Sequence, residues 1–341
     1  MSGSPKVVPI LRPQPRVRPG HAGVRSQLRV LENELHRVES APADARGHGV
    51  PAALSNLLQE AIGSIRWDNA AQALAALYFS WHSEEVDEFG YDRRFTETIR
   101  PLLEFLYTVW WRVDATGLDH VPGRGQALVV GNHAGVLPWD GLMVNLALRH
   151  AHPGGRECRL LALDMFALLP FLAPLLSRIG AVRANPENGE RLLNKGEVVG
   201  VFPEGVKGVG KYFRDRYKLA RFGRGGFVRV ALRTGAPIVP CAIVGSEEVH
   251  PMLGTANWVG RPFGLPYFPI TPTFPLLGPM GVIPLPSKWT IEFAPPMAMD
   301  RYGPEAAEDP ILVNRLSEQV RQTIQEMING RLARRESVWF G

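Results

Sequence analysis

Residues 127–140, ALVVGNHAGVLPWD, decide how the rest of the chain is interpreted. The first four residues form an apolar run that is typical of a buried strand, and the run ends at a glycine. His133 follows directly behind it, and Asp140 comes seven positions later. In an open α/β sheet, ligands and catalytic groups collect in the loops that follow the carboxyl ends of strands. Because a histidine exchanges protons near neutral pH, this stretch predicts a catalytic loop.

The same alternation of short apolar runs and helical spacing continues along the chain from Gly117 onward. Strands are expected at residues 127–130, 159–163, 198–202, 238–244 and 290–293. Helices are expected at residues 141–149, 165–179, 187–194, 226–234 and 310–331. Short apolar strands with intervening helices indicate an α/β fold, in which a mostly parallel sheet has helices on both faces.

The amino-terminal third differs in composition, and we divide the chain into three parts. Residues 1–49 form a basic, proline-rich arm that is expected to be largely disordered, with spacing for one short amphipathic helix. Residues 50–113 have helical spacing and end in a cluster of aromatic side chains, which fits either a membrane interface or packing against a sheet. Residues 114–341 are expected to form the α/β domain with its carboxyl-terminal helix.

Charge and cysteine content restrict the class of protein. The 38 basic and 33 acidic residues leave a net charge of +5, and no acidic residue precedes Glu32. A basic arm of this kind suits an anionic surface, although a solvated tail has the same composition. Cys158 and Cys241 lie in apolar strand-like runs, so we expect buried, reduced thiols and a cytosolic environment rather than a disulfide.

No segment has the features of a secretory signal or of an ordinary transmembrane helix. Residues 1–23 lack an apolar core and contain five prolines. Met165–Leu176 is apolar but too short to span a bilayer, and Pro262–Ser287 is uncharged but contains eight prolines. We therefore expect interfacial, lid-like or core surfaces in both segments, and a protein that lies peripherally on the cytoplasmic face of a membrane.

A second polar loop follows an expected strand at residues 201–208, VFPEGVKG. The carboxylate of Glu204 lies where the strand ends, and such a group can hold a substrate hydroxyl or orient a basic neighbour. The side chains that follow would attract phosphate groups, although a solvated basic loop is the alternative. These basic residues are Lys207, Lys211, Arg214, Arg216, Lys218, Arg221 and Arg224.

The combined pattern resembles the glycerolipid (lysophospholipid) acyltransferase superfamily, and in particular its bacterial branch similar to monoacylglycerol acyltransferases. It consists, in order, of Asn132-His133 with Asp140, FPEG at 202–205, FGRGGF at 222–227 and PIVP at 237–240. The resemblance extends over Val113–Met297, just over half of the chain, and FPEG is its most specific part. It implies an α/β fold and the transfer of an acyl chain from acyl-CoA or acyl-carrier protein to a hydroxyl, with no cofactor and no metal.

The resemblance also implies roles for the first motif, with His133 as general base and Asp140 as its partner. The family's usual spacing is His-x4-Asp, whereas six residues separate the two here, so the loop must bend back for them to meet. Asp140 also fits the N-cap of the expected helix over residues 141–149, and the two roles are compatible. A thioester already carries a good leaving group, so no serine or cysteine nucleophile is required.

Candidates for binding the substrate come from three places. The resemblance implies that Glu204 and Gly205 lie in the acceptor-binding loop, and we add Lys207 and Arg224 from the basic stretch behind it. Arg183 ends IGAVR at residues 179–183, a partial match to a motif whose arginine binds acceptor phosphate. The basic loop favours a lysophospholipid such as lysophosphatidate as acceptor, with neutral mono- or diacylglycerol as the alternative.

Two hypotheses from other classes compete with this interpretation. A non-catalytic peripheral membrane protein that binds lipid would keep the basic arm and the apolar segments but would need neither His133 nor Glu204. A metal-dependent hydrolase would use His133 and Asp140 with His150 and His152, yet no further ligand cluster follows in the sequence. A nucleic-acid partner is not expected, because the arm lacks an aromatic platform. The expected partners are thus a lipid acceptor, an acyl thioester and a membrane surface.

Overall fold

The computed structural model describes residues 86–133, 137, 139–162, 172–256 and 268–341, all within one compact unit, Ala73–Gly341. The predicted arm at residues 1–49 lies outside the described residues, as do residues 50–85 of the predicted helical segment. Most of Met165–Leu176 and the first residues of Pro262–Ser287 lie outside them as well. The fold below therefore concerns the expected α/β domain and the end of the segment that precedes it.

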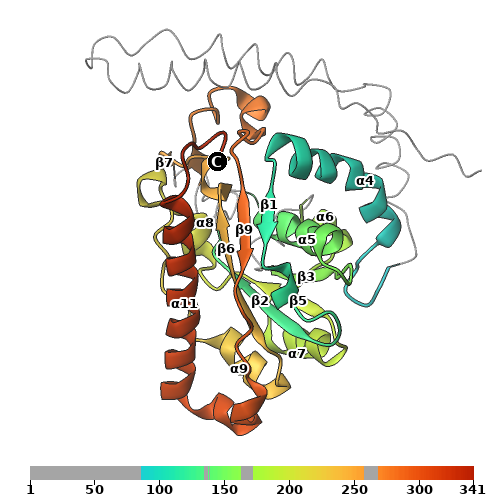
Figure 1. Cartoon of the computed structure of the whole chain (residues 1–341). Helices are drawn as coiled ribbons and strands as arrows, with labels where there is room; N and C mark the ends of the chain where they lie inside the picture. Colours follow the sequence, from blue (N-terminus) through green and yellow to red (C-terminus); the bar gives the residue numbers. More distant parts are fainter. Residues whose placement is uncertain (1–85, 134–136, 138, 163–171, 257–267) are drawn as a thin grey trace, which may run out of the picture. The chain divides into compact units, whose positions relative to one another are not determined.

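A single seven-stranded sheet forms the centre of this unit. Its strands are β1 (Asp114–Thr116), β2 (Ala127–Gly131), β3 (Cys158–Ala162), β4 (Ala181–Arg183), β5 (Val198–Val201), β6 (Ile238–Val244) and β9 (Thr290–Phe293). They lie in the order β1-β9-β6-β2-β5-β3-β4 (Figure 1). All neighbours run parallel except β6 and β9, which are antiparallel. The predicted α/β fold with a mostly parallel sheet is therefore confirmed.

Helices connect and cover these strands. The α-helices are α4 (Arg93–Phe105), α5 (Trp139–Ala151), α6 (Leu172–Arg178), α7 (Pro186–Asn194), α8 (Val206–Val209), α9 (Gly226–Thr234) and α11 (Pro310–Leu332). A π-helical turn η1 (Leu106–Trp110) extends α4. Short 3₁₀ turns are η2 (Leu118–His120), η4 (Phe213–Asp215), η5 (Ser246–Glu248), η7 (Gly278–Val282), η8 (Asp300–Tyr302) and η9 (Pro304–Glu308). A separate antiparallel pair joins β7 (Gly254–Thr255) to β8 (Pro269–Ile270).

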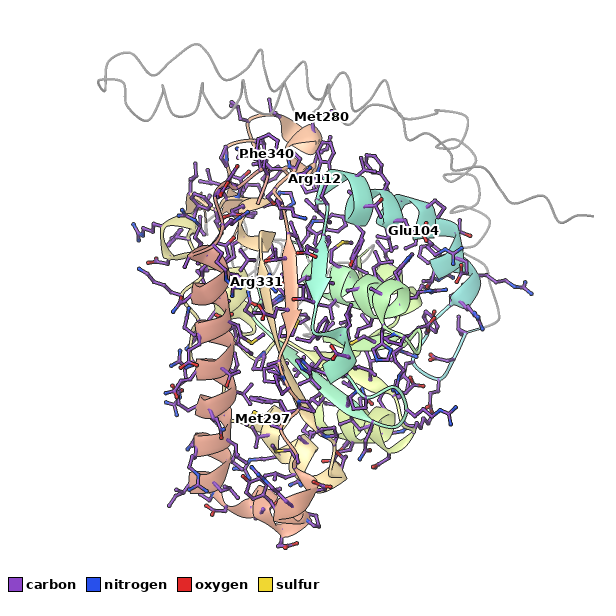
Figure 2. The ribbon with its side chains drawn as sticks, in the orientation of Figure 1. Glu104, Arg112, Met280, Met297, Arg331 and Phe340 are labelled. Carbon is purple, nitrogen blue, oxygen red and sulfur yellow. The ribbon has the colours of Figure 1, made fainter. Side chains whose placement is uncertain are left out.

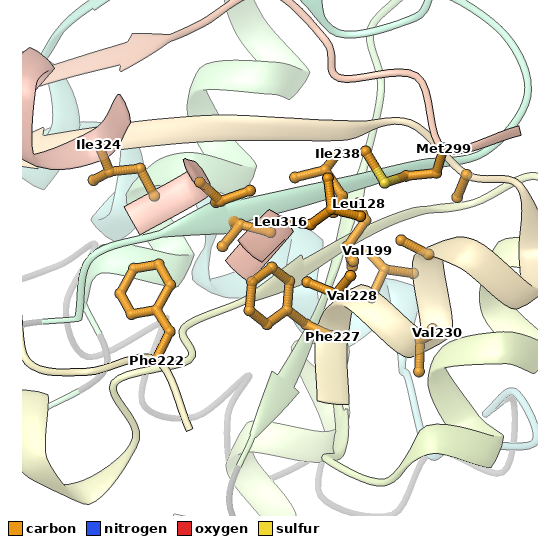
Figure 3. Close-up of a cluster of buried hydrophobic side chains, with 14 of the residues drawn as sticks. Leu128, Val199, Phe222, Phe227, Val228, Val230, Ile238, Met299, Leu316 and Ile324 are labelled. Atoms are coloured by element: carbon orange, nitrogen blue, oxygen red, sulfur yellow. The ribbon is translucent and has the colours of Figure 1, made fainter. Parts of the chain in front are cut away.

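The pleat of β6 divides its side chains between two cores. Ile238 and Val244 belong to a core that α7, α9 and α11 complete, and Figure 3 shows part of it. Val239 and Ile243 belong to a second core, to which α4 and α5 contribute from the opposite face. Successive residues of a strand point to opposite faces of the sheet, so a strand that is apolar throughout must be covered on both. Helices cover both faces here, as predicted.

Local sequence explains where several of the helices begin and end. Asn185 and Asp309 cap α7 and α11 by accepting backbone N–H bonds from the first turn, and a proline follows each cap. At both ends of α9 a glycine takes the left-handed conformation, Gly225 with φ 73° and Gly235 with φ 68°. A side chain at Gly225 would also lie 2.4 Å from Val313 of α11, so this glycine permits the two helices to approach.

Two isoleucines of α11 test how this helix packs on the first core. Ile324 is fully buried, whereas Ile311 is 79% exposed. We expect Ile324→Ala to lower the free energy of unfolding by about 2–5 kcal/mol, because it removes buried methylenes and leaves a cavity. Ile311→Ala should change it by less than about 0.5 kcal/mol. Urea unfolding followed by circular dichroism measures both values, and equal losses would contradict the packing of α11.

Candidate functional site

The loop that carries His133 is fixed by the side chain of the residue before it. Asn132 is fully buried, and its Nδ2 donates to the carbonyl oxygen of Ile243 at 2.9 Å. The N–H of Ile243 donates back to Asn132 Oδ1 at 2.7 Å. This pair of bonds continues the pairing of β2 with β6 beyond the end of β2, so it sets the position at which His133 leaves the sheet. The sequence places Asn132 beside His133 but carries no signal for this role.

His133 and Asp140 meet despite the six residues between them. His133 Nδ1 lies 2.8 Å from Asp140 Oδ2, and both side chains are buried. Asp140 lies in the first turn of α5, where the helix dipole favours a carboxylate. Since α5 begins at Trp139, Asp140 is inside the helix, and the N-cap role considered above is wrong. When the Nδ1–H group donates a hydrogen bond to the carboxylate, Nε2 carries no hydrogen and is the basic nitrogen of the ring.

Glu204 anchors the loop after β5 to the loop of His133. Its carboxylate is buried, and Oε1 accepts the backbone N–H of His133 at 3.1 Å. The other oxygen, Oε2, accepts the backbone N–H of Ala220 at 2.8 Å and lies 3.3 Å from Lys211 Nζ. Gly205 takes a left-handed φ of 57° directly behind it. The contacts of Glu204 are therefore with the protein, and they hold the backbone from which His133 projects.

Lys211 is shared between two buried carboxylates. Its Nζ lies 3.3 Å from Glu204 Oε2 and 3.3 Å from Glu247 Oε1. Burial raises the pKa of Glu247 to about 7. The positive charge of Lys211 acts in the opposite direction, because it favours the charged form of the carboxylate. Glu247 was not predicted as a site residue. The only signal for it in the sequence is that an acidic residue follows the expected strand at residues 238–244. Lys211 therefore offsets part of the negative charge of the two carboxylates.

Two further residues fit closely around His133. The ring of Phe202 stacks on its imidazole with centroids 5.0 Å apart. A Cβ at Gly208 would lie 2.9 Å from the carbonyl oxygen of His133 and 2.8 Å from Glu204 Cβ. Only a glycine therefore lets the turn of α8 approach this loop so closely.

An apolar cavity opens beside the imidazole at the carboxyl edge of the sheet. The empty space there is about 550 Å³, part of which is open to solvent, and His133 lines it together with residues from α5, β3, α6 and β4. The other lining residues are Gly141, Leu142, Leu160, Leu161, Ala162, Leu176, Ile179, Ala181 and Phe202. A cavity with one basic nitrogen and otherwise apolar walls suits an alkyl chain whose polar end reacts at the histidine.

The remaining predicted binding residues lie around this centre, and the structure does not bring them into contact with His133. Lys207 is exposed on α8, directly before the glycine that touches His133. Arg224 is exposed before α9. Arg183 ends β4 and is exposed at the same edge of the sheet, but β3 and β5 separate β4 from β2. All three side chains are exposed, and none of them lines the cavity.

The two further histidines of the metal hypothesis, His150 and His152, contact other groups of the protein. Within the described part of the chain, His, Cys, Asp and Glu side chains form no group of three or more that would hold a metal ion. His152 Nε2 lies 2.8 Å from the carbonyl oxygen of Val121, and its Nδ1 accepts the N–H of Gly154. His150 Nε2 lies 3.4 Å from Glu104.

None of the helices among the described residues combines the length and apolar character that crossing a bilayer requires.

Both cysteines are buried in the sheet, Cys158 on β3 and Cys241 on β6. Burial raises the pKa of the Cys158 thiol to about 12 and that of Cys241 well above its ordinary value. A thiol must ionise to act as a nucleophile.

Because both thiols are buried, we expect no labelling of the folded protein by Ellman's reagent at pH 8, and two equivalents after unfolding in urea. Rapid labelling before unfolding would contradict the burial of these thiols.

This fold and site define an α/β protein in which a buried histidine–carboxylate pair lies beside an apolar cavity, an arrangement suited to base-assisted transfer of an acyl group. The chain matches the family model described as Acyltransferase over residues 112–244, and it belongs to that family. As a member of this family it acts on an acyl donor and an acceptor.

Similar proteins come from bacteria and mammals. An uncharacterized protein of Mycobacterium tuberculosis is 47% identical over 313 residues, which cover 92% of this chain and 84% of that protein. A Bos taurus protein, DGAT1/2-independent enzyme synthesizing storage lipids, is 25% identical over 224 residues, or 65% of this chain and 58% of that protein. The crystal structure of the 1-acyl-sn-glycerophosphate (LPA) acyltransferase, PlsC, from Thermotoga maritima has 19% identity and a TM-score of 0.44, covering 77% of this chain and 88% of that one.

Proposed function

We propose that this acyltransferase moves a fatty acyl chain from a thioester, acyl-CoA or acyl-carrier protein, to a glycerolipid hydroxyl, with His133 as general base. The observation that carries the proposal is the 2.8 Å contact between His133 Nδ1 and Asp140 Oδ2 beside an apolar cavity. A metal is not required for this reaction, because the thioester is already activated. A lipid-binding protein without catalysis would need no buried histidine–carboxylate pair.

In the proposed reaction, Nε2 of His133 removes the proton from the acceptor hydroxyl as its oxygen attacks the thioester carbonyl carbon. Asp140 stabilises the imidazolium that forms and keeps the ring in the productive tautomer. The tetrahedral intermediate then expels the thiolate as the C–S bond breaks, and the imidazolium returns the proton to the sulfur. General-base assistance of this kind contributes about 10²–10⁴ in rate.

The cavity would hold the acyl chain next to the reacting carbonyl. Its walls from Leu160, Leu161 and Leu176 offer only apolar contacts, and each methylene removed from water contributes about 0.8 kcal/mol. The thioester carbonyl would then lie near His133, which lines the same cavity. Close packing around the ring by Phe202 limits the water that would otherwise hydrolyse the donor.

The acceptor is proposed to be a lysophospholipid such as lysophosphatidate, bound through its phosphate by exposed basic side chains. Lys207, Arg224 and Arg183 are exposed and are suited to an anionic headgroup. Glu204 and Gly205 would shape the acceptor loop from its buried side, given that Glu204 already accepts the His133 N–H. A neutral acceptor, mono- or diacylglycerol, is the second candidate, which the name of the bovine relative favours. We further propose that the protein works peripherally on the cytoplasmic face of a membrane.

The role of His133 is tested with a matched histidine. His133→Ala should lower the rate of transfer from labelled acyl-CoA by at least about 10²-fold, because the acceptor hydroxyl loses its base. His150→Ala should retain nearly full activity, since His150 lies at the surface and contacts Glu104. Binding to lipid vesicles should be unchanged in both variants. Turnover by His133→Ala at the wild-type rate would overturn the mechanism.

The acceptor is tested by comparing lysophosphatidate with monoacylglycerol under the same assay. We expect the higher kcat/KM for lysophosphatidate, and we expect Arg183→Gln with Lys207→Gln to raise the KM for that acceptor alone. A preference for monoacylglycerol that these substitutions leave unchanged would favour the neutral acceptor. A protein that binds vesicles but acylates neither lipid would contradict the glycerolipid assignment.

A further inference from the structure

We propose that an apolar crest, formed by Leu253, Leu276, Leu277, Met280, Val282 and Ile283, inserts into a bilayer that contains anionic lipids. The inference rests on the proposed function, since an enzyme that acylates glycerolipids must reach them in a membrane. It goes further by naming the surface that enters the lipid and by relating that surface to His133.

Exposed apolar side chains are concentrated in the crest. Leu276 is 82% exposed, Leu253 60% and Met280 51%. Seven of the eleven large apolar side chains that are exposed in the described part of the chain lie between residues 253 and 283. The sequence from Pro262 to Ser287 contains no charged residue. Contiguous exposed apolar side chains on an uncharged segment are typical of a surface that leaves water when the protein binds its partner.

The crest is built from tight turns that bond their own polar groups. The N–H of Thr271 donates to the carbonyl oxygen of Phe274 at 2.7 Å, and Thr271 Oγ1 accepts the N–H of Phe274 at 2.9 Å. Thr273 Oγ1 donates to the carbonyl oxygen of Gly281 at 3.0 Å, and the N–H of Leu277 donates to Thr273. Lipid cannot hydrogen-bond to a backbone, so internal bonding of this kind lowers the cost of insertion.

Tryptophans hold the base of the crest against η1. Trp110 Nε1 donates to the carbonyl oxygen of Pro284 at 2.9 Å, and Trp111 Nε1 donates to that of Leu285 at 3.0 Å. Figure 2 shows Met280 at the same end of the described unit as Arg112, whose guanidinium donates to the carbonyl oxygen of Pro286 at 3.1 Å. These bonds fix the base of the crest to the core, where Trp111 is fully buried, so the exposed apolar side chains are held on a rigid support.

Basic side chains flank the crest and make an anionic bilayer the favoured partner. The N–H of Phe213 donates to the carbonyl oxygen of Met252 at 2.9 Å, which places η4 next to the crest residue Leu253. In this segment the side chain of Arg214 is 79% exposed and that of Lys218 is 76% exposed. Asp215 lies between them, but Arg216 adds a further positive charge, so residues 213–218 are positively charged. Exposed cations beside an apolar tip are attracted to anionic headgroups.

Topology connects the crest to the edge of the sheet where His133 lies. Because β6 and β9 are antiparallel, with Val244 opposite Thr290, the chain between them leaves and re-enters the sheet at one edge. That edge is the one where β2 ends at Gly131, opposite Cys241. Glu247, in the same excursion, contacts Lys211 and through it Glu204. Insertion of the crest would therefore turn the edge that carries His133 toward the lipid.

An environment-sensitive label tests insertion directly. Because Cys158 and Cys241 are buried, a cysteine introduced at Leu276 or at Ile311 can be labelled alone with an NBD fluorophore. The two side chains are 82% and 79% exposed, and α11 begins beside η9, away from the crest (Figure 1). On adding vesicles of phosphatidylcholine with phosphatidylglycerol, we expect a blue shift at position 276, quenching there by brominated lipid, and no change at 311. Vesicle-bound protein without a shift at 276 would overturn the proposal.

The same positions test whether the crest is occupied by protein instead of lipid. A label at 276 that is shielded before vesicles are added, and more so at higher protein concentration, would indicate a second copy of the chain and would overturn the proposal. Shielding that does not depend on concentration would indicate cover by another part of this chain, with the same consequence. A label that is exposed in solution and shielded on vesicles supports insertion.

Substitution of the crest distinguishes failure of docking from failure of the proposed function. We expect Leu276→Asp with Met280→Asp to lower flotation with anionic vesicles at least tenfold, and Ile311→Asp to leave it unchanged. Acyl transfer to a vesicle-bound acceptor should fall in parallel, while transfer to a dispersed short-chain acceptor should be retained. Undiminished flotation would overturn the docking surface. If the wild type acylates neither acceptor, the proposed function fails. The NBD label at position 276 still shows in that case whether the crest inserts into the bilayer.

Discussion

The hydrogen bond from the backbone N–H of His133 to Glu204 is the contact on which the rest of the site depends, because it joins the loops that follow β2 and β5. A buried carboxylate is costly unless it is paired. The N–H of Ala220 and the ammonium of Lys211 supply this pairing, and Lys211 also contacts Glu247. Segments that are far apart in the sequence are thereby held around one histidine. The ring of this histidine contacts Asp140 and lines the cavity.

The parallel arrangement of the strands explains why these segments meet. The loops after β2, β5 and β6 all leave the sheet at one edge, since the three strands are parallel neighbours. The cavity opens at the same edge, and β9, which runs antiparallel to β6, returns the chain there after the crest. The direction of the strands therefore explains why the base, the cavity and the proposed docking surface lie at the same edge of the sheet.

Local pattern predicted much of the fold and part of the site. The expected strands at residues 238–244 and 290–293 agree with β6 and β9, because β6 is a continuous apolar run and β9 alternates polar with apolar residues. The three-residue strands β1 and β4 were not predicted, since runs so short acquire strand geometry only by pairing with β9 and β3. Glu247 was missed because it joins the site through Lys211, a neighbour 36 positions away in the sequence.

By itself, the sequence determined the longer strands and helices of the α/β domain, and it indicated that the loops of His133 and Glu204 carry polar chemistry. Both depend on periodicity and residue type, which are local properties. Tertiary structure alone decided that Asp140 reaches the imidazole across six residues, and that Glu204 accepts the N–H of His133. These contacts depend on how loops bend and on which segments pack beside them. The spacing of residues along a chain does not contain that information, because a loop of given length can close in many ways.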